Sequence, residues 1–201
     1  MSLFEFDAEK RSLYGAICGI DEAGRGCLAG DVFAAAVALD GETVFDGLND
    51  SKKLSPKTRE RLYDEITAKS VSYAVASASV EEIEELNILG ASLLAMKRAF
   101  EKMRGGVSIN LALIDGNRTP DMETPVETVT GGDGKSASIA AASILAKVSR
   151  DRYMGKLDII YPEYQFSRHK GYGTRAHYEM IEKFGVCPVH RKSFLKKPHG
   201  W

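Results

Sequence analysis

Four acidic residues follow three apolar runs of strand length, and their side chains are the first candidates for chemistry: Asp21, Glu22, Asp115 and Asp133. In α/β proteins, functional side chains gather at strand ends and on the loops that leave them. Four carboxylates gathered in one place would repel each other unless a cation neutralised them. Because hard oxygen ligands favour Mg²⁺ or Mn²⁺, the pattern predicts a metal site of the kind that supports phosphoryl transfer. Each acid taken singly is more typical of an ordinary turn after a strand.

Asp21 and Glu22 are neighbours in the sequence, which sets a geometric condition on a shared site. Successive residues of a strand point to opposite faces of the sheet. Both residues can therefore reach one metal site only if the backbone bends there or if a backbone carbonyl acts as a ligand. Gly24 and Gly26 follow at once and make such a bend accessible.

Two nucleotide-binding patterns occur nearby, and both are rejected. Residues Gly24–Ala29 match the loose dinucleotide pattern G-x-G-x-x-[G/A], but a strand-like run, 32–39, follows where the pattern requires a helix. Two acids also precede the motif, where a phosphate would be repelled. Residues Gly134–Ser136 resemble the end of a P-loop, yet Val129 occupies the position of the first P-loop glycine.

The hydrophobic pattern predicts the strands and helices that must position the acids. Apolar or alternating runs of strand length cover residues 14–20, 32–39, 71–77, 109–114 and 126–130. Capping and periodicity signals indicate helices over 55–68, from 79, and over 91–103, 137–153 and 174–184. The first two strands are joined by a short connection and are expected to be neighbours. The order of elements predicts an α/β domain, with a mixed sheet and helices packed on it.

Length and composition fit one globular domain. The 201 residues are 44% hydrophobic and 27% charged, and no apolar stretch approaches the ~20 residues of a membrane helix. The first residues lack a basic segment followed by an apolar run, so no secretory signal is recognised and a cytoplasmic location is expected. An odd number of cysteines without a C-x-x-C spacing argues against a disulfide framework or a zinc site; they are Cys18, Cys27 and Cys187.

Positive charge is concentrated toward the C-terminal end, although the net charge of the whole chain is only −1. Residues 168–201 hold eight Lys or Arg, two Glu and all four histidines. Such a segment suits a polyanionic partner, and Lys196 and Lys197 are expected to add sequence-independent phosphate contacts. On charge alone, a solvated basic tail is equally consistent. We expect residues 1–160 to form the catalytic domain and residues 161–201 to form a basic helical extension of the same compact unit.

Seven blocks of the sequence, in order along nearly the whole chain, resemble the ribonuclease HII family: 21–26, 48–54, 114–117, 132–133, 140–148, 169–174 and 190–194. Each block is specific by itself, and together they leave little room for coincidence. The resemblance implies an α/β, RNase H-like fold, with a mixed sheet flanked by helices and a C-terminal helical extension. The sequence departs from the family at Cys27 and Asp31, where proline is common, and neither position is expected to be a ligand.

The resemblance also implies roles for individual residues. Metal-binding catalytic roles fall on the four acids, Asp21, Glu22, Asp115 and Asp133. Gly24, Arg25 and Gly26 would recognise the 2′-hydroxyl of a ribonucleotide, largely through their backbone groups. Tyr172 would stack on the sugar of the following deoxynucleotide. A loop that contacts phosphate is matched by Ser51 and Lys52.

Together with the acids, the resemblance implies a monomeric endoribonuclease that depends on Mg²⁺ or Mn²⁺. Its partners would be RNA–DNA hybrid duplexes and DNA containing ribonucleotides, with no membrane. A two-metal-ion hydrolysis on the 5′ side of a ribonucleotide would leave a 3′-hydroxyl and a 5′-phosphate. Two alternatives stay open: a related metal-dependent nuclease for another nucleic acid, such as a junction resolvase, and a non-catalytic nucleic-acid binding module. The four acids disfavour the binding module, because a protein that only binds has no reason to place acids against phosphates.

Overall fold

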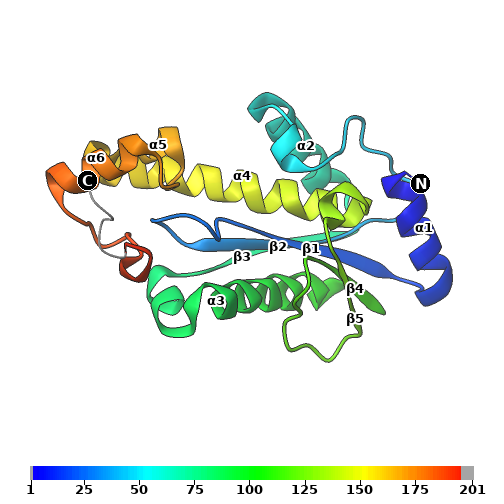
Figure 1. The fold of residues 1–201 in the computed structure, drawn as a ribbon. Coiled ribbons are helices and arrows are strands. Elements are labelled where there is room, and N and C mark those ends of the chain that lie inside the picture. The colour runs from blue at the N-terminus through cyan, green and yellow to red at the C-terminus, as the bar shows by residue number, and fades with distance from the viewer. Residues whose placement is uncertain (1, 196–201) are drawn as a thin grey trace.

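Five strands form one mixed sheet within residues 2–195, the part of the chain that this computed structural model describes (Figure 1). The strands are β1 (Ile17–Ala23), β2 (Val32–Ala38), β3 (Ser72–Ala78), β4 (Leu111–Asp115) and β5 (Val126–Val129). They lie in the order β3-β2-β1-β4-β5, with β2 antiparallel to β1 and β3, and with β4 parallel to β1 and β5. The predicted mixed sheet and the pairing of its first two strands are therefore confirmed.

Helices cover both faces of this sheet. The α-helices are α1 (Leu3–Tyr14), α2 (Pro56–Lys69), α3 (Val80–Met103), α4 (Ala137–Ile160), α5 (Phe166–His169) and α6 (Arg175–Phe184). α3 lies along one face and α4 along the other, and α2 packs against the outer side of α4 (Figure 1). The short helices α5 and α6 lie near the C-terminal end of α4, whereas α1 lies near its N-terminal end (Figure 1). Within residues 2–195, no helix combines the length and the apolar character needed to cross a bilayer.

Small side chains let α4 approach the sheet closely. β2 reads Val-Phe-Ala-Ala-Ala-Val-Ala, and the first turns of α4 supply buried alanines and serines. Gly19 on β1 lies beneath α4, where an added Cβ would collide with the backbone of Ser138 and Ile139. The missing side chain at Gly19 therefore permits the distance between helix and sheet. The predicted buried helix is confirmed, and it runs past its predicted end at Tyr153 to Ile160.

The helix starts of α2 and α3 follow the predicted signals. Ser55 caps α2, and the Ser79–Glu82 capping box opens α3. α3 is interrupted at Asn87, where φ is 60°, and the Asn87 side-chain oxygen accepts hydrogen bonds from the N–H groups two and three residues on. Asn87 thus caps the second part of α3, which explains why the sequence indicates two helical segments here.

The helix α1 is not predicted by the hydrophobic pattern, and Tyr14 does not begin a strand as expected. A capping box of Ser2 and Glu5 opens α1, and Gly15, with φ 84°, ends it before β1 starts. The apolar residues of α1 follow no helical period, and its one fully buried residue is the acidic Asp7. A search for an apolar stripe therefore passes over this helix.

The C-terminal segment packs against the loop between β1 and β2 and against the end of α4. A buried cluster joins Ala29 of that loop to Met154 of α4 and to Cys187. Backbone hydrogen bonds tie the same loop to residues 171 and 189–191. The C-terminal segment thus packs onto the loop that contains Gly24, Arg25 and Gly26, which we call the Gly-Arg-Gly loop. Lys196 and Lys197 lie outside the described residues.

Candidate active site

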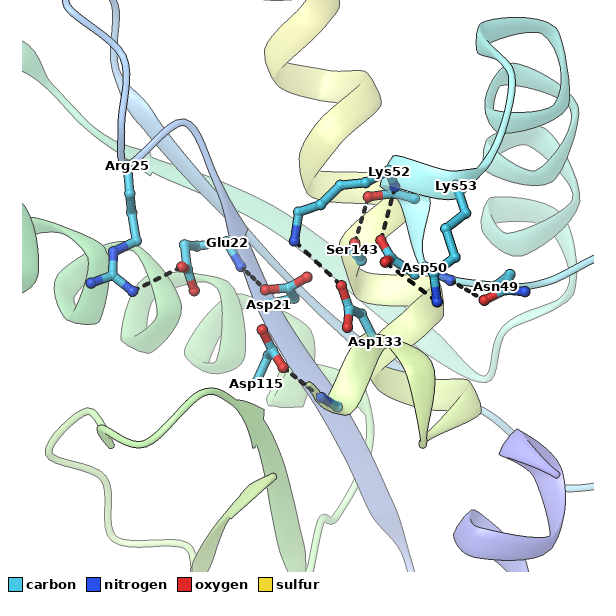
Figure 2. A network of polar contacts seen from close by, with 12 residues as sticks. Asp21, Glu22, Arg25, Asn49, Asp50, Lys52, Lys53, Asp115, Asp133 and Ser143 are labelled. Carbon is cyan, nitrogen blue, oxygen red and sulfur yellow. Dashed lines mark hydrogen bonds and ion pairs between the residues drawn. The ribbon is translucent and has the colours of Figure 1, made fainter. Parts of the chain in front are cut away.

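The parallel pairing of β1 and β4 brings two of the four acids together. Ile20 pairs with Ile114, so the next residues along the two strands, Asp21 and Asp115, lie side by side at the C-terminal end of β4. Asp133 follows on the turn after β5, which is the neighbour of β4. Figure 2 shows the carboxylates of these three aspartates facing a common space. The structure therefore brings together three acids that come from separate strands.

Glu22 lies at the same place but its side chain points elsewhere. β1 keeps its regular pairing with β2 to the end of the strand, so no bend separates Asp21 from Glu22. Asp21 faces α4 and interacts with the Ser143 hydroxyl, whereas Glu22 forms an ion pair with Arg25 at 3.2 Å (Figure 2). The N–H of Glu22 donates to Asp21 Oδ1 at 2.7 Å. The bend that would turn both side chains to one site is absent, and the chain turns only at Gly24.

Burial and mutual repulsion raise the pKa of three of these carboxyl groups. Burial raises the pKa of Asp21 well above its usual range, and the charges of Glu22 and Asp115 raise it further. Burial also raises the pKa of Glu22, against the opposing effect of Arg25. Burial raises the pKa of Asp133, and the charge of Asp115 adds to the effect. The fold thus assembles negative charge that its own cations do not balance.

Each of the four carboxylates interacts with a donor from the protein itself. Asp115 Oδ1 accepts a hydrogen bond from the N–H of Gly132 at 2.6 Å, and Asp133 Oδ2 lies 3.5 Å from Lys52 Nζ (Figure 2). With these contacts in place, no three His, Cys, Asp or Glu side chains within residues 2–195 are grouped as ligands of a metal ion. A cation would have to replace these donors. The chemistry of the donor set fits a hard divalent ion, because every oxygen it offers is a carboxylate.

The loop before α2 holds Lys52 near the acids. Arg59 of α2 fixes this loop by donating to two of its backbone carbonyls. Burial opposes the charged form of Lys52, but the combined attraction of Asp133, Asp21 and Asp50 outweighs it and raises the pKa of Lys52. The Ser51 side chain is buried, and its hydroxyl hydrogen-bonds to that of Ser143 at 2.7 Å. Only the Lys52 side chain of this predicted pair is therefore available to a phosphate, and Ser51 faces α4.

Two buried arginines support the Gly-Arg-Gly loop, and neither was singled out from the sequence. Arg150 of α4 donates to the backbone carbonyls of Ala29, Asp31 and Lys170. Arg191 donates, at 2.6–3.0 Å, to the carbonyls of Arg25, Cys27 and Gly30. Burial and repulsion from Arg150 lower the pKa of Arg191 to about 10. The loop therefore rests on two guanidinium groups that are satisfied by carbonyls.

The two glycines of this loop have different surroundings. Gly24 has a φ of 99°, and a Cβ at this position would collide with the Arg150 side chain. Gly26 has no atom within 4 Å of the place where a Cβ would stand. The first glycine is thus required by the fold of the loop, whereas the second leaves the backbone open to a ligand.

Tyr172 lies on the other side of the same loop, where it forms a backbone bridge with Cys27. The residue is 41% exposed, and Lys147 Nζ and Arg150 Cζ lie 5.8 and 6.0 Å from the centroid of its ring. A ring nitrogen of His177 contacts the Tyr172 carbonyl at 2.9 Å. The predicted site residues thus run from the acids, across the Gly-Arg-Gly loop, to an exposed aromatic ring.

A relay of hydrogen bonds beneath Tyr172 involves two buried histidines. The N–H of Cys187 donates to His190 Nδ1, so the His190 proton resides on Nε2, which contacts His177 Nε2 at 3.1 Å. His177 Nε2 accepts this hydrogen bond, so the single N–H of the neutral His177 ring is at Nδ1, which donates to the Tyr172 carbonyl. Burial lowers the pKa of His190, and it lowers the pKa of His177 to about 4. Both rings are therefore neutral near pH 7.

Comparisons with known proteins identify the family of this chain. A model of the ribonuclease HII family matches residues 18–197. The ribonuclease HII of Caldicellulosiruptor saccharolyticus is 50% identical over 194 residues, covering 95% of this chain and 94% of the relative. That of Dechloromonas aromatica is 56% identical over 180 residues, covering 90% and 91%.

A solved structure shows the same fold. The ribonuclease H2 from Pyrococcus horikoshii OT3 superimposes with a TM-score of 0.72 at 26% identity, covering 89% of this chain and 93% of that one. The RNase H-like fold, with its helical C-terminal part, is therefore confirmed. The sequence blocks, the strand-end acids and these relatives agree, and the chain belongs to the ribonuclease HII family of endoribonucleases.

Proposed function

We propose that this chain hydrolyses the phosphodiester bond on the 5′ side of a ribonucleotide, in RNA–DNA hybrids and in DNA with embedded ribonucleotides. The products are a 3′-hydroxyl and a 5′-phosphate. The observation that supports the proposal is the gathering of Asp21, Asp115 and Asp133 beside the Gly-Arg-Gly loop. An excess of buried negative charge favours a bound cation, and the loop beside it offers an open backbone to a sugar.

In this proposal, Mg²⁺ or Mn²⁺ is held by Asp21, Glu22, Asp115 and Asp133. A divalent charge would relieve the repulsion that raises the pKa of Asp21 and Asp133. Asp115 and Asp133 would release their present donors as they turn to the cation, and Glu22 would release Arg25. A pair of such ions supplies stabilisation to the attacking and leaving oxygens of the phosphodiester and lowers the pKa of the attacking water.

We further propose that the sugar is recognised between the loop and Tyr172. The 2′-hydroxyl both donates and accepts a hydrogen bond, and it distinguishes RNA from DNA at a given sugar. The backbone of Gly24, Arg25 and Gly26 would bind it, because the space around Gly26 is open. The Tyr172 ring would lie on the next sugar, where a second 2′-hydroxyl would crowd it. Lys52 would contact the phosphate once it is released from Asp133, and Ser51 would act through its backbone because its hydroxyl is bound to another serine.

An end-labelled duplex with one ribonucleotide in a DNA strand tests this function. We expect a single cut, on the 5′ side of the ribonucleotide, that requires Mg²⁺ or Mn²⁺ and disappears in excess chelator. Asp133→Asn serves as the matched inactive protein. Undiminished cleavage in excess chelator would contradict the metal role, and a cut on the 3′ side would contradict the assigned bond. Cleavage of an all-DNA four-way junction in preference to this duplex would favour the related-nuclease alternative.

A further inference from the structure

Asp7 is a fully buried carboxylate in α1, and it contacts the start of α4. Its Oδ1 accepts a hydrogen bond from Ser136 Oγ at 2.6 Å, and its Oδ2 accepts from Ser138 N and Oγ at 2.8 and 2.6 Å. Asp7 and Ser136 are 129 residues apart in the sequence. Figure 1 shows α1 beside the N-terminal end of α4. The contact therefore joins the first helix of the chain to the helix that follows the Asp133 turn.

α4 lacks an acid of its own in its first turn. The N-terminus of a helix carries unpaired N–H groups and a partial positive charge, both of which favour a carboxylate. Ser136 caps α4 by accepting from the N–H of Ile139, and Asp7 adds the negative charge from another helix. The short, charge-assisted hydrogen bonds to two serines fix the position of this terminus.

The turn between β5 and α4 transmits this position to the acids. The N–H of Ser136 donates to the carbonyl of Gly132 at 2.8 Å, which closes the turn that holds Asp133. The N–H of the same Gly132 donates to Asp115 Oδ1 at 2.6 Å. One line of hydrogen bonds thus runs from Asp7, through Ser136 and Gly132, to Asp115, with Asp133 in the enclosed turn.

Two further contacts hold α1 in place and thereby fix the position of Asp7. Phe6 packs against the buried cluster around Leu113 and Ile139. Lys10 forms an ion pair with Glu127 of β5 at 2.6 Å. The Lys10 contact anchors the same helix to the sheet without touching the Asp133 turn, and it therefore offers a matched control.

We propose that Asp7 is a positioning residue for the reaction: it holds the turn of residues 132–136 so that Asp115 and Asp133 share one cation site. This inference rests on the metal-binding roles proposed above for these two aspartates. A residue that merely stabilised α4 would change the stability of the protein and leave the kinetics of the folded enzyme unaltered. A positioning residue changes the turnover of the folded enzyme and the metal concentration that it requires.

The test is Asp7→Asn, which keeps the size of the side chain but removes its charge and one acceptor. We expect kcat to fall about tenfold, as losses of contacts that orient metal ligands do, and the Mg²⁺ concentration for half-maximal rate to rise by a similar factor. KM for the duplex should stay unchanged. Amide hydrogen exchange in the metal-free protein should accelerate at residues 132–139 and remain unchanged in α2.

Lys10→Ala is the control, because it loosens α1 without removing the carboxylate. We expect its kcat to stay near that of the wild type. An equal loss of kcat in Lys10→Ala and Asp7→Asn, or an unchanged kcat and metal dependence in Asp7→Asn, would overturn the inference. If Asp7→Asn does not fold, Ser138→Ala carries the same test, since it removes one donor to Asp7 and leaves the charge. Asp133→Asn is measured alongside: full activity there refutes the proposed site itself, whereas inactivity there with an unaltered Asp7→Asn refutes only the role of Asp7.

Discussion

Two neighbouring regions of the molecule accommodate their charged groups differently. One is the carboxylate cluster, and the other is the Gly-Arg-Gly loop with its two supporting arginines. In the cluster, four acids share two cationic neighbours, Lys52 and Arg25, at 3.5 and 3.2 Å. In the loop, Arg150 and Arg191 each donate to three backbone carbonyls. Acids that lack enough cationic partners are suited to binding a cation from outside, whereas guanidinium groups that donate to several backbone carbonyls hold a segment in place. Substitutions in the two regions should therefore have opposite consequences for stability.

The largest effect is expected for Asp133→Asn, which removes a negative charge from the carboxylate cluster. Activity on a duplex with one ribonucleotide should fall at least about a hundredfold, because the substitution removes a proposed direct ligand rather than a supporting contact. The melting temperature should stay unchanged or rise, since repulsion from Asp115 disappears. Cleavage rate and thermal unfolding, measured on the same preparation, check both parts. A strongly destabilised protein would instead identify Asp133 as a structural residue.

Arg191→Met should have the opposite effect on stability, because it removes a side chain whose hydrogen bonds hold the loop. The carbonyls of Arg25, Cys27 and Gly30 lose their donor, and the free energy of unfolding should fall by about 3 kcal/mol, given ~1–3 kcal/mol for each buried group left unpaired. Urea denaturation measures this change. Lys192→Met, at the exposed neighbouring position, is the control and should change stability by less than about 0.5 kcal/mol. A loss below about 1 kcal/mol in Arg191→Met would show that water replaces the guanidinium, and the comparison between the regions would fail.

Tyr172→Ala tests whether the loop region also carries specificity. The ratio of cleavage rates, for a single embedded ribonucleotide over a continuous RNA strand, should fall about tenfold, which corresponds to ~1.4 kcal/mol. Tyr172→Phe keeps the ring and should keep the ratio. The two substrates are measured at equal concentration below KM. An unchanged ratio in Tyr172→Ala would mean that the ring only positions the backbone of its substrate.

The smallest effect at neutral pH is expected from the histidine relay beneath Tyr172. The pKa of His177 is lowered to about 4 in the folded protein, mainly by burial, and His169 and His190 add repulsion. An unfolded chain with an ordinary histidine pKa of ~6.5 takes up this proton first, so stability is complete above pH ~6.5 and declines as the pH falls toward 4. Melting temperatures of the wild type should drop more steeply across this window than those of His177→Gln, which does not titrate there. Parallel curves for the two proteins would remove His177 as the cause.

The strand-end acids could be predicted because their signal is local. An apolar run followed by an acid identifies Asp21, Asp115 and Asp133, and the parallel register of β1 and β4 then places the first two side by side. The direction of Glu22 could not be predicted in this way. It depends on whether β1 bends, and the pairing of β1 with β2 keeps the strand regular.

The supporting residues were missed because their partners are distant in the sequence. Arg150 lies on a helix predicted to be buried, and a charge on a buried face is itself a signal that partners are required. Which carbonyls it meets depends on the packing of the β1–β2 loop. Asp7 offers no such signal, because the hydrophobic pattern does not even indicate its helix. Local patterns thus identify the acids at the strand ends, whereas the groups that hold the surrounding loops follow from tertiary packing.

The single helix α4 has a consequence for how the proposed site measures its substrate. Ser143, which contacts Asp21, Lys147, which flanks Tyr172, and Arg150, which supports the loop, are spaced i, i+4 and i+7, and they share one side of the helix. The helix therefore acts as a ruler of about two turns, roughly 10 Å long, between the acids and the aromatic ring. One inserted residue would rotate everything beyond it by about 100°. Only insertions or deletions of about one or two whole helical turns would keep these side chains on one side of α4. The distance along α4 between the acids and Tyr172 can therefore change only in steps of about one turn.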